Sequence, residues 1–187
     1  MIVHVLCELA LFVACLWAAL GSLRRRQGWA LLGFALLGLA ALLGALVYAG
    51  LAQLEPLHHE LSNLAGRLAL LLIAIGGASS LGLNLAVIGF CAVMLWVPDG
   101  SSLGVNLLAL LAIARKGRSL RWPAALAGAV AFAATGLLVG TRGDWFGVAR
   151  VDLFHLGLAL AVCCWARAEL GGLAQGWSRA PGLSRGH

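Results

Sequence analysis

The stretch RVDLFHLGLALAVCCWAR, residues 150–167, decides the fold, because it is an apolar run with a charged residue at each end. With slight tilt, residues 151–166 are enough to cross a bilayer core of roughly 30 Å at about 1.5 Å per residue. Asp152 and His155 are three residues apart and so share one face of a helix. Ionisable groups inside a membrane helix are costly and usually face the bundle interior with a partner. The stretch therefore predicts a transmembrane helix with a functional pair at its start.

The composition of the whole chain is that of an integral membrane protein. Hydrophobic residues make up 62% of the 187 residues and charged residues only 11%, against about 25% in soluble domains. The net charge of +6 comes from short basic clusters between apolar runs, a pattern typical of cytoplasmic loops, so we expect no nucleic-acid partner. The five cysteines lie inside apolar runs without CxxC spacing, and we expect them to pack as small apolar side chains.

The apolar runs predict an all-α fold, a polytopic bundle of seven transmembrane helices in a single domain. The expected spans are residues 2–20, 29–54, 61–75, 81–97, 101–114, 122–140 and 151–166. After the second span, Pro56 suits a helix start or a turn, and Pro98-Asp99-Gly100 is a turn sequence, whereas the break at 76–80 carries no charge. Residues 1–170 form the bundle in this prediction, and residues 171–187 form a disordered cytoplasmic tail rich in Gly, Ser and Arg.

Positive charge sets the expected orientation. The strongest basic clusters, 24–26 and 115–121, must share the cytoplasmic side, which requires an even number of spans between them, and four are predicted. With the N-terminus outside, ten of the thirteen Lys and Arg residues fall in cytoplasmic segments. We therefore predict an outside N-terminus and a cytoplasmic C-terminus.

The same orientation gathers the groups capable of chemistry at the outer half. Every histidine except His187 and every acid except Glu169 falls there: His4, Glu8, Glu55, His58, His59, Glu60, Asp99, Asp144, Asp152 and His155. Imidazole with carboxylate is a ligand set for zinc, and a catalytic zinc site needs about three protein ligands and an open position. The sequence thus indicates an outer pocket of histidines and acids.

These residues also have structural interpretations, which the sequence leaves open. His4 and Glu8 are four residues apart and can pair locally, and Asp152 and His155 can form an internal ion pair that holds the bundle together. Arg67, about two turns into the third span, is expected to be the charge partner of a buried acid such as Glu8 or Asp152.

The segment His58, His59 and Glu60 lies beside Pro56 and is expected in the connection between the second and third spans. Its structural interpretation is a solvated connector. Its functional interpretation is a source of metal ligands from His58 and His59 and of a proton acceptor from Glu60.

Seven spans, an acid in the first span and an aspartate and histidine at the start of the seventh resemble the superfamily of alkaline ceramidases and progestin/adiponectin receptors. The segment VDLFHLGLALAVCCWARA is most similar to the last span of small bacterial members. The resemblance implies a zinc ion held by three histidines near the outer leaflet, whose bound water attacks a lipid amide with help from an aspartate and a serine. It matches His155 to a last-span ligand and Glu8 to the span-one acid.

The chain departs from that pattern at two places. Position 159 is Ala where a second histidine is expected, and no serine is followed four residues later by histidine in the second or third span; His58 and Ser62 have the reverse order. A three-histidine site would therefore recruit His4, His58 or His59.

Two functions follow as hypotheses. The first is a zinc-dependent lipid amide hydrolase of the bacterial cytoplasmic (inner) membrane, acting on membrane lipid. Its zinc ligands would be drawn from His155, His4, His58, His59 and Glu8, with Asp152 or Glu60 as proton acceptor. The second is a non-enzymatic bundle that binds a lipid, a small ligand or a proton through a buried charge network.

Overall fold

The computed structural model describes residues 2–78, 80–96, 99–145 and 147–171, and the described chain is almost entirely helical. In order its elements are α1 (Ile2–Arg24), α2 (Gly28–Tyr48), the 3₁₀ turn η1 (Ala52–Leu54), α3 (Glu55–Ile75), α4 (Leu81–Trp96), α5 (Asp99–Ala114), α6 (Trp122–Ala134), the π-helical η2 (Thr135–Val139), β1 (Asp144–Trp145), β2 (Val148–Ala149) and α7 (Arg150–Ala168). The all-α prediction is confirmed, since β1 and β2 form only a short antiparallel ribbon. The predicted turn at Pro98 and the predicted tail beyond residue 171 lie outside the described residues.

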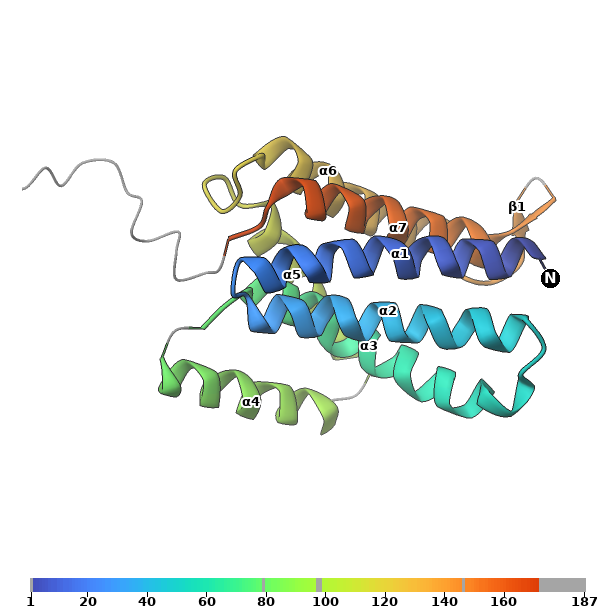
Figure 1. Ribbon diagram of the computed structural model, residues 1–187, viewed down its shortest axis with the longest axis horizontal. Helices are drawn as coiled ribbons and strands as arrows, with labels where there is room; N and C mark the ends of the chain where they lie inside the picture. The colour runs from blue at the N-terminus through green and yellow to red at the C-terminus, as the bar shows by residue number, and fades with distance from the viewer. Residues whose placement is uncertain (1, 79, 97–98, 146, 172–187) are drawn as a thin grey trace, which may run out of the picture.

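Six of the helices close into a ring. Around it α1 packs on α2, α2 on α3, α3 on α5, α5 on α6, α6 on α7, and α7 returns to α1. The remaining helix, α4, packs against α3 at the edge of the bundle (Figure 1). The chain begins at one end of the bundle, and residue 171 lies at the other (Figure 1).

Four helices are long and apolar enough to cross a membrane. They are α1, α2, the continuous run of α6 and η2 at Trp122–Val139, and α7. The apolar helices Leu81–Trp96 and Leu103–Ala114 are shorter. Length and composition therefore support a membrane protein with at least these candidate spans, and the count of seven stays a prediction.

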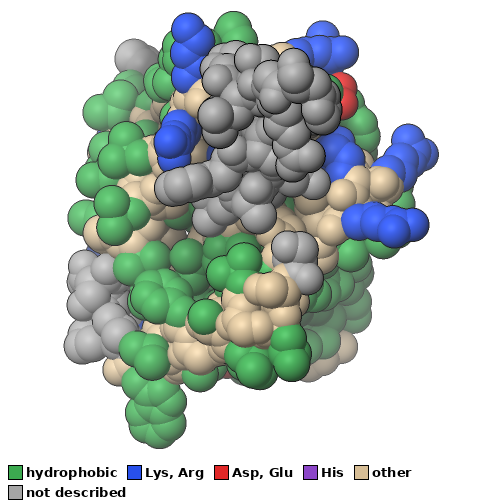
Figure 2. All heavy atoms as spheres, turned by 90° about the vertical axis from the view of Figure 1, so that its left-hand side faces the viewer, with side chains coloured by type: hydrophobic (Ala, Val, Ile, Leu, Met, Phe, Trp, Pro, Cys, Tyr) green, Lys and Arg blue, Asp and Glu red, His purple; other side chains and the backbone are tan. Residues whose placement is uncertain are grey.

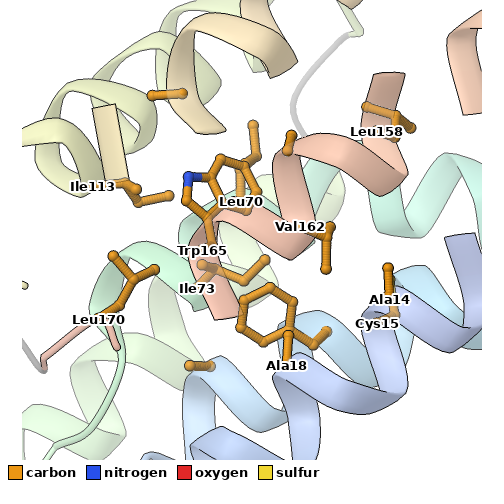
Figure 3. Close-up of a cluster of buried hydrophobic side chains, with 14 of the residues drawn as sticks. Ala14, Cys15, Ala18, Leu70, Ile73, Ile113, Leu158, Val162, Trp165 and Leu170 are labelled. Carbon is orange, nitrogen blue, oxygen red and sulfur yellow. The ribbon is translucent and has the colours of Figure 1, made fainter. Parts of the chain in front are cut away.

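Small residues bring the helices of the ring into close contact around the main core (Figure 3). A Cβ at Gly128 of α6 would lie 2.5 Å from the indole Nε1 of Trp165 on α7, and one at Gly33 of α2 would lie 2.7 Å from the carbonyl oxygen of Ala69 on α3. Trp165 is 1% exposed and packs among side chains from several helices. Close packing of this kind is how helices associate where lipid removes the hydrophobic drive between them.

Two predicted boundaries are wrong in a way that matters for function. The second span was expected to run to residue 54, but α2 ends at Tyr48; α3 begins at Glu55 rather than at residue 61. Pro56 lies in the first turn of α3, where its missing N–H has no intrahelical partner to lose. The proline thus starts a helix, and His58, His59 and Glu60 lie on its first turns instead of in a loop.

Basic side chains collect at the end of the bundle where α1, α3, α5 and α7 finish. This end, which we call the basic end, faces the viewer in Figure 2, and Lys and Arg side chains stand along its rim. Glu169 is the one acid among the described residues here. The basic residues are Arg24, Arg25, Arg26, Arg115, Lys116, Arg118, Arg121 and Arg167. The opposite end, with the start of α1 and α7, is called the N-terminal end.

Candidate functional site

Near the N-terminal end, His4 of α1 meets Asp152 of α7. Nδ1–H of His4 donates to Oδ1 of Asp152 over 2.5 Å, and the side chains are 28% and 5% exposed. The ring of Tyr48, at the end of α2, lies 5.0 Å from the His4 ring between centroids. Three helices therefore meet at this pair, and its histidine still reaches the surface while its carboxylate does not.

About one turn further along both helices, Glu8 of α1 faces His155 of α7. Nδ1 of His155 lies 3.5 Å from Oε1 of Glu8, and the Glu8 side chain is only 1% exposed. At this separation the contact is an electrostatic one rather than a short hydrogen bond. Neither carboxylate oxygen of Glu8 has a hydrogen-bond partner among the described residues. A buried acid with unused acceptors is therefore held next to an imidazole.

His58 of α3 completes the group from the other side of α2. Its Nδ1–H donates to the carbonyl oxygen of Ala40 over 3.1 Å, and the hydroxyl of Ser62 lies 3.4 Å from the same nitrogen. Gly44 of α2 separates His58 from Glu8: a Cβ there would clash with the Glu8 carboxylate and lie 3.0 Å from Cε1 of His58. The missing side chain at Gly44 is what lets the acid and the histidine approach one another.

These side chains border a cavity of about 170 Å³ inside the ring. Its polar lining comes from Glu8, His58, Ser62 and His155. The rest of its lining is small or apolar: Leu11, Leu37, Ala40, Ala41, Ala65, Gly66, Ala69, Leu70, Phe132, Phe154 and Leu158. An apolar cavity of roughly 150 Å³ is known to hold a molecule the size of benzene. The cavity thus combines a hydrogen-bonding group of residues with an apolar remainder of useful size.

A second hollow of about 240 Å³ lies between α5 and α6. Phe132 lines both this hollow and the central cavity. Asn106 lines it from α5, where Nδ2–H donates to the carbonyl oxygen of Gly66 over 2.9 Å; its Oδ1 is buried and has no hydrogen-bond partner among the residues that the structure describes. Phe132 therefore lies between the central cavity and the hollow formed by α5 and α6.

The structure brings together four of the predicted ligand residues and leaves the others apart. His4, Glu8, His58 and His155 lie in the group just described, with the predicted catalytic Asp152. His59 and Glu60 are exposed on α3, and Nδ2–H of Asn63 donates to Nδ1 of His59 over 3.2 Å. Successive residues of a helix point to different faces, so His58 and His59 cannot both face the cavity.

Arg67 contacts α4. Nη1 of Arg67 donates to the carbonyl oxygen of Leu95 over 3.1 Å. The acids that it was expected to compensate, Glu8 and Asp152, face His155 and His4. The role of Arg67 as the charge partner of a buried acid stays a prediction.

Sequence reasoning missed the contributions of Gly44, Ser62 and Phe132. The i, i+4 spacing of His58 and Ser62 carried a usable signal once both are placed on a helix. Gly44 and Phe132 carried none, because their role comes from the packing of α2 and α6 against other helices.

The donor set does not fit a catalytic zinc ion as the side chains lie. Within residues 2–78, 80–96, 99–145 and 147–171, no group of three or more His, Cys, Asp or Glu side chains is placed to hold a metal. A catalytic zinc needs about three such ligands. The residues form His and carboxylate pairs, in which each donor already faces one partner.

Comparison with known proteins adds no relative. No protein-family model matches the chain, and neither the curated proteins nor the solved structures gave a match.

Proposed function

We propose that this chain is a seven-span membrane protein with its N-terminal end outside and its basic end in the cytoplasm of a bacterial cell. The four long apolar helices, the two shorter ones and α3, which packs against α2 and α5, make up this count. The concentration of Lys and Arg at one end supports the orientation, because cytoplasmic segments carry an excess of these residues.

Within that frame, the central cavity binds a small amphipathic molecule whose head donates hydrogen bonds to Glu8. The observation that carries this proposal is that Glu8 lines the cavity while both of its carboxylate oxygens are buried and have no hydrogen-bond partner among the described residues. A buried acceptor left unpaired costs about 1–3 kcal/mol, more when it is charged. A ligand that supplies N–H or O–H groups would remove that cost.

The chemistry of the lining narrows the class of ligand. Glu8 is the acid of the cavity lining and no Lys or Arg among the described residues lines it, so a head that donates N–H groups is favoured over a carboxylate or phosphate, whose oxygens are acceptors. His58 adds an acceptor, because a neutral ring that donates from Nδ1 carries its lone pair on Nε2. The apolar side chains on the rest of the wall suit a short hydrocarbon tail. The proposed ligand class is a short-chain primary amine.

The hydrolase hypothesis is the alternative, and it stays a prediction. It assigns proton transfer to Asp152 or Glu60 and places zinc on His155 with Glu8, His4, His58 or His59. The arrangement supports it less well, because His59 and Glu60 are exposed on α3 and the remaining residues form pairs rather than a three-ligand set. No step through a metal is therefore derived.

Hexylamine binding to the protein in lipid nanodiscs tests the proposal. Saturable binding is expected for the parent, together with a rise in unfolding temperature, because a ligand that binds only the folded state stabilises it. Glu8→Gln should weaken binding at least tenfold, since it replaces one carboxyl oxygen by an amide NH₂ group at nearly constant volume. Glu60→Gln is the matched control and should bind as the parent does.

Elemental analysis of the same samples, purified without a polyhistidine tag, separates the two functions. The binding function requires no stoichiometric zinc, whereas the hydrolase requires about one ion per chain that His155→Ala removes. Equal hexylamine binding by the parent and Glu8→Gln would refute the binding proposal, and zinc in the parent would favour the hydrolase.

A further inference from the structure

At the basic end, the turn after α1 and the turn before α6 both contact the end of α7 beside Glu169. Nη2 of Arg121, at the start of α6, lies 3.8 Å from Oε1 of Glu169, and Nη1 of the same residue donates to the carbonyl oxygen of Arg167 over 3.4 Å. The guanidinium of Arg25 folds back over Gly21 of α1. Gln27, two residues after Arg25, donates from Nε2 to the carbonyl oxygen of Leu170 over 2.6 Å, which places this turn beside Glu169. Burial lowers the pKa of Arg25, and the nearby Glu169 carboxylate opposes that shift. Among the described residues, Glu169 is therefore the acid near both arginines.

A third arginine, Arg118, contacts the chain two residues after Glu169. It is 7% exposed and uses Nη2 to donate to the carbonyl oxygens of Ala74 and Ile73 at the end of α3. Its Nε donates to the carbonyl oxygen of Gly171 over 3.2 Å, whereas its Nη1 is buried and has no hydrogen-bond partner in the part of the chain that the structure describes. Burial lowers the pKa of Arg118 to about 10, so the group is still a cation at neutral pH. Among the described residues, this buried positive charge thus donates to backbone carbonyls and to no carboxylate.

The charges at this place do not balance. Arg25, Arg118 and Arg121 carry three positive charges, and Glu169 supplies one negative charge. Nε of Arg25 is also buried and finds no hydrogen-bond partner within the described ranges. Glu169 has a φ of +53°, a left-handed conformation that is uncommon for residues other than glycine. Glu169 therefore neutralises one of the three positive charges, and N–H groups of the arginines remain to bind a second anion.

We propose that Arg25, Arg121 and the buried Arg118 form a binding site for the phosphate of an anionic phospholipid. Guanidinium groups bind phosphate through paired N–H donors, and basic pockets between helices at the cytoplasmic side of membranes bind such head groups. Exposed apolar side chains lie beside the site, with Leu23 57% exposed on the last turn of α1 and Leu120 66% exposed next to Arg121. They provide a surface for acyl chains, which a soluble anion would not use.

The test compares nanodiscs of phosphatidylcholine with nanodiscs that contain phosphatidylglycerol. The parent protein should unfold at a higher temperature with phosphatidylglycerol, and native mass spectrometry should find this lipid retained after detergent extraction. Arg121→Gln should weaken retention about fivefold, the effect of one basic residue near a charged membrane surface. Arg115→Gln removes the same charge from an exposed position of the same end and should change retention much less.

Glu169→Gln should have the opposite effect on phosphatidylglycerol binding. It removes the carboxylate that competes for the arginines, so phosphatidylglycerol should bind more tightly than in the parent. Arg25→Gln should behave as Arg121→Gln does, and Arg121 is the more exposed position should Arg25→Gln fail to fold. The proposal is overturned if Arg115→Gln weakens retention as much as Arg121→Gln, which would indicate only a diffuse positive field. It is also overturned if phosphatidylglycerol gives no stabilisation, or if inorganic phosphate in phosphatidylcholine discs reproduces the full effect.

Discussion

Asp152 pairs with His4 across the contact between α7 and α1, at 2.5 Å, although His155 is only three residues away on its own helix. The second pair is crossed in the same way, because His155 faces Glu8 of α1 rather than Asp152. Each helix thus offers one acid and one histidine, and each acid takes its partner from the other helix. The two pairs join α1 and α7 at two successive depths.

Double-mutant cycles should detect the crossed pairing. His4→Ala with Asp152→Ala, and separately Glu8→Ala with His155→Ala, should each show a coupling free energy of about 1 kcal/mol or more, as expected for residues in direct contact. The free energy of unfolding in a mild detergent is the quantity to measure. The control cycle joins His4→Ala with His155→Ala, which are not partners, and should couple less. Stronger coupling there than within the crossed pairs would contradict the observed arrangement.

Replacing Gly44 tests the contact between α2 and the site. Gly44→Ala places a methyl group against the Glu8 carboxylate and His58 and should destabilise the protein by about 1–3 kcal/mol, as overpacking of a filled interior does. It should also weaken hexylamine binding, because Glu8 must move. Gly89→Ala in α4 is the control, since Gly89 does not line the cavity and a Cβ built there meets no heavy atom of the described residues within 4 Å beyond its own helix backbone. If the two variants change the unfolding temperature equally, α2 accommodates the extra methyl group without strain and the prediction is wrong.

Arg67 is expected to hold α4 against α3. Arg67→Leu removes the hydrogen bond from Nη1 to the carbonyl oxygen of Leu95 and should speed amide hydrogen exchange in α4 more than in α1 or α7. Because the lost hydrogen bond has a charged donor, the free energy needed to open α4 locally should fall by about 1.5–3 kcal/mol. Arg142→Leu, at an exposed position, is the control. Faster exchange spread evenly over all helices would instead assign Arg67 to global stability.

The proposed orientation predicts which positions an impermeant thiol reagent reaches. In a background without the five native cysteines, Gln53→Cys and Asp144→Cys should label in intact cells, because both positions are exposed at the N-terminal end. Arg26→Cys and Lys116→Cys, exposed at the basic end, should label only after the cells are opened. Labelling of position 116 in intact cells would reverse or break the proposed topology.

The sequence predicted the gathering of histidines and acids better than their pairing. Charge asymmetry and helical spacing were enough to place His4, Glu8, Asp152 and His155 at one end, because both depend on residue order alone. Spacing along one helix suggested pairs within α1 and within α7. The actual partners depend on how the two helices are rotated against each other, and small residues at distant contacts such as Gly128 against Trp165 help to set that rotation.

The start of α3 shows a second limit. Glu55 to Glu60 is polar and contains proline, which in sequence resembles a loop. In the structure these residues form the first turns of a helix, where proline is tolerated and a first-turn acid is favoured by the helix dipole. The cavity could not be predicted at all, because it is bounded by side chains from five helices that are far apart in the chain.

The position of α4 beside the ring determines the direction in which α5, α6 and α7 run. The ring closes through α3 and α5, which run the same way, as the contacts of Arg118 with Ala74 and of Asn106 with Gly66 require. Two parallel neighbours cannot be joined by a short turn, so the chain needs a return segment between them, and α4 is that segment. Without it α5, α6 and α7 would each be inverted, and Asp152 and His155 would arrive at the far end from His4 and Glu8. A helix that touches none of the four residues thereby determines that they meet.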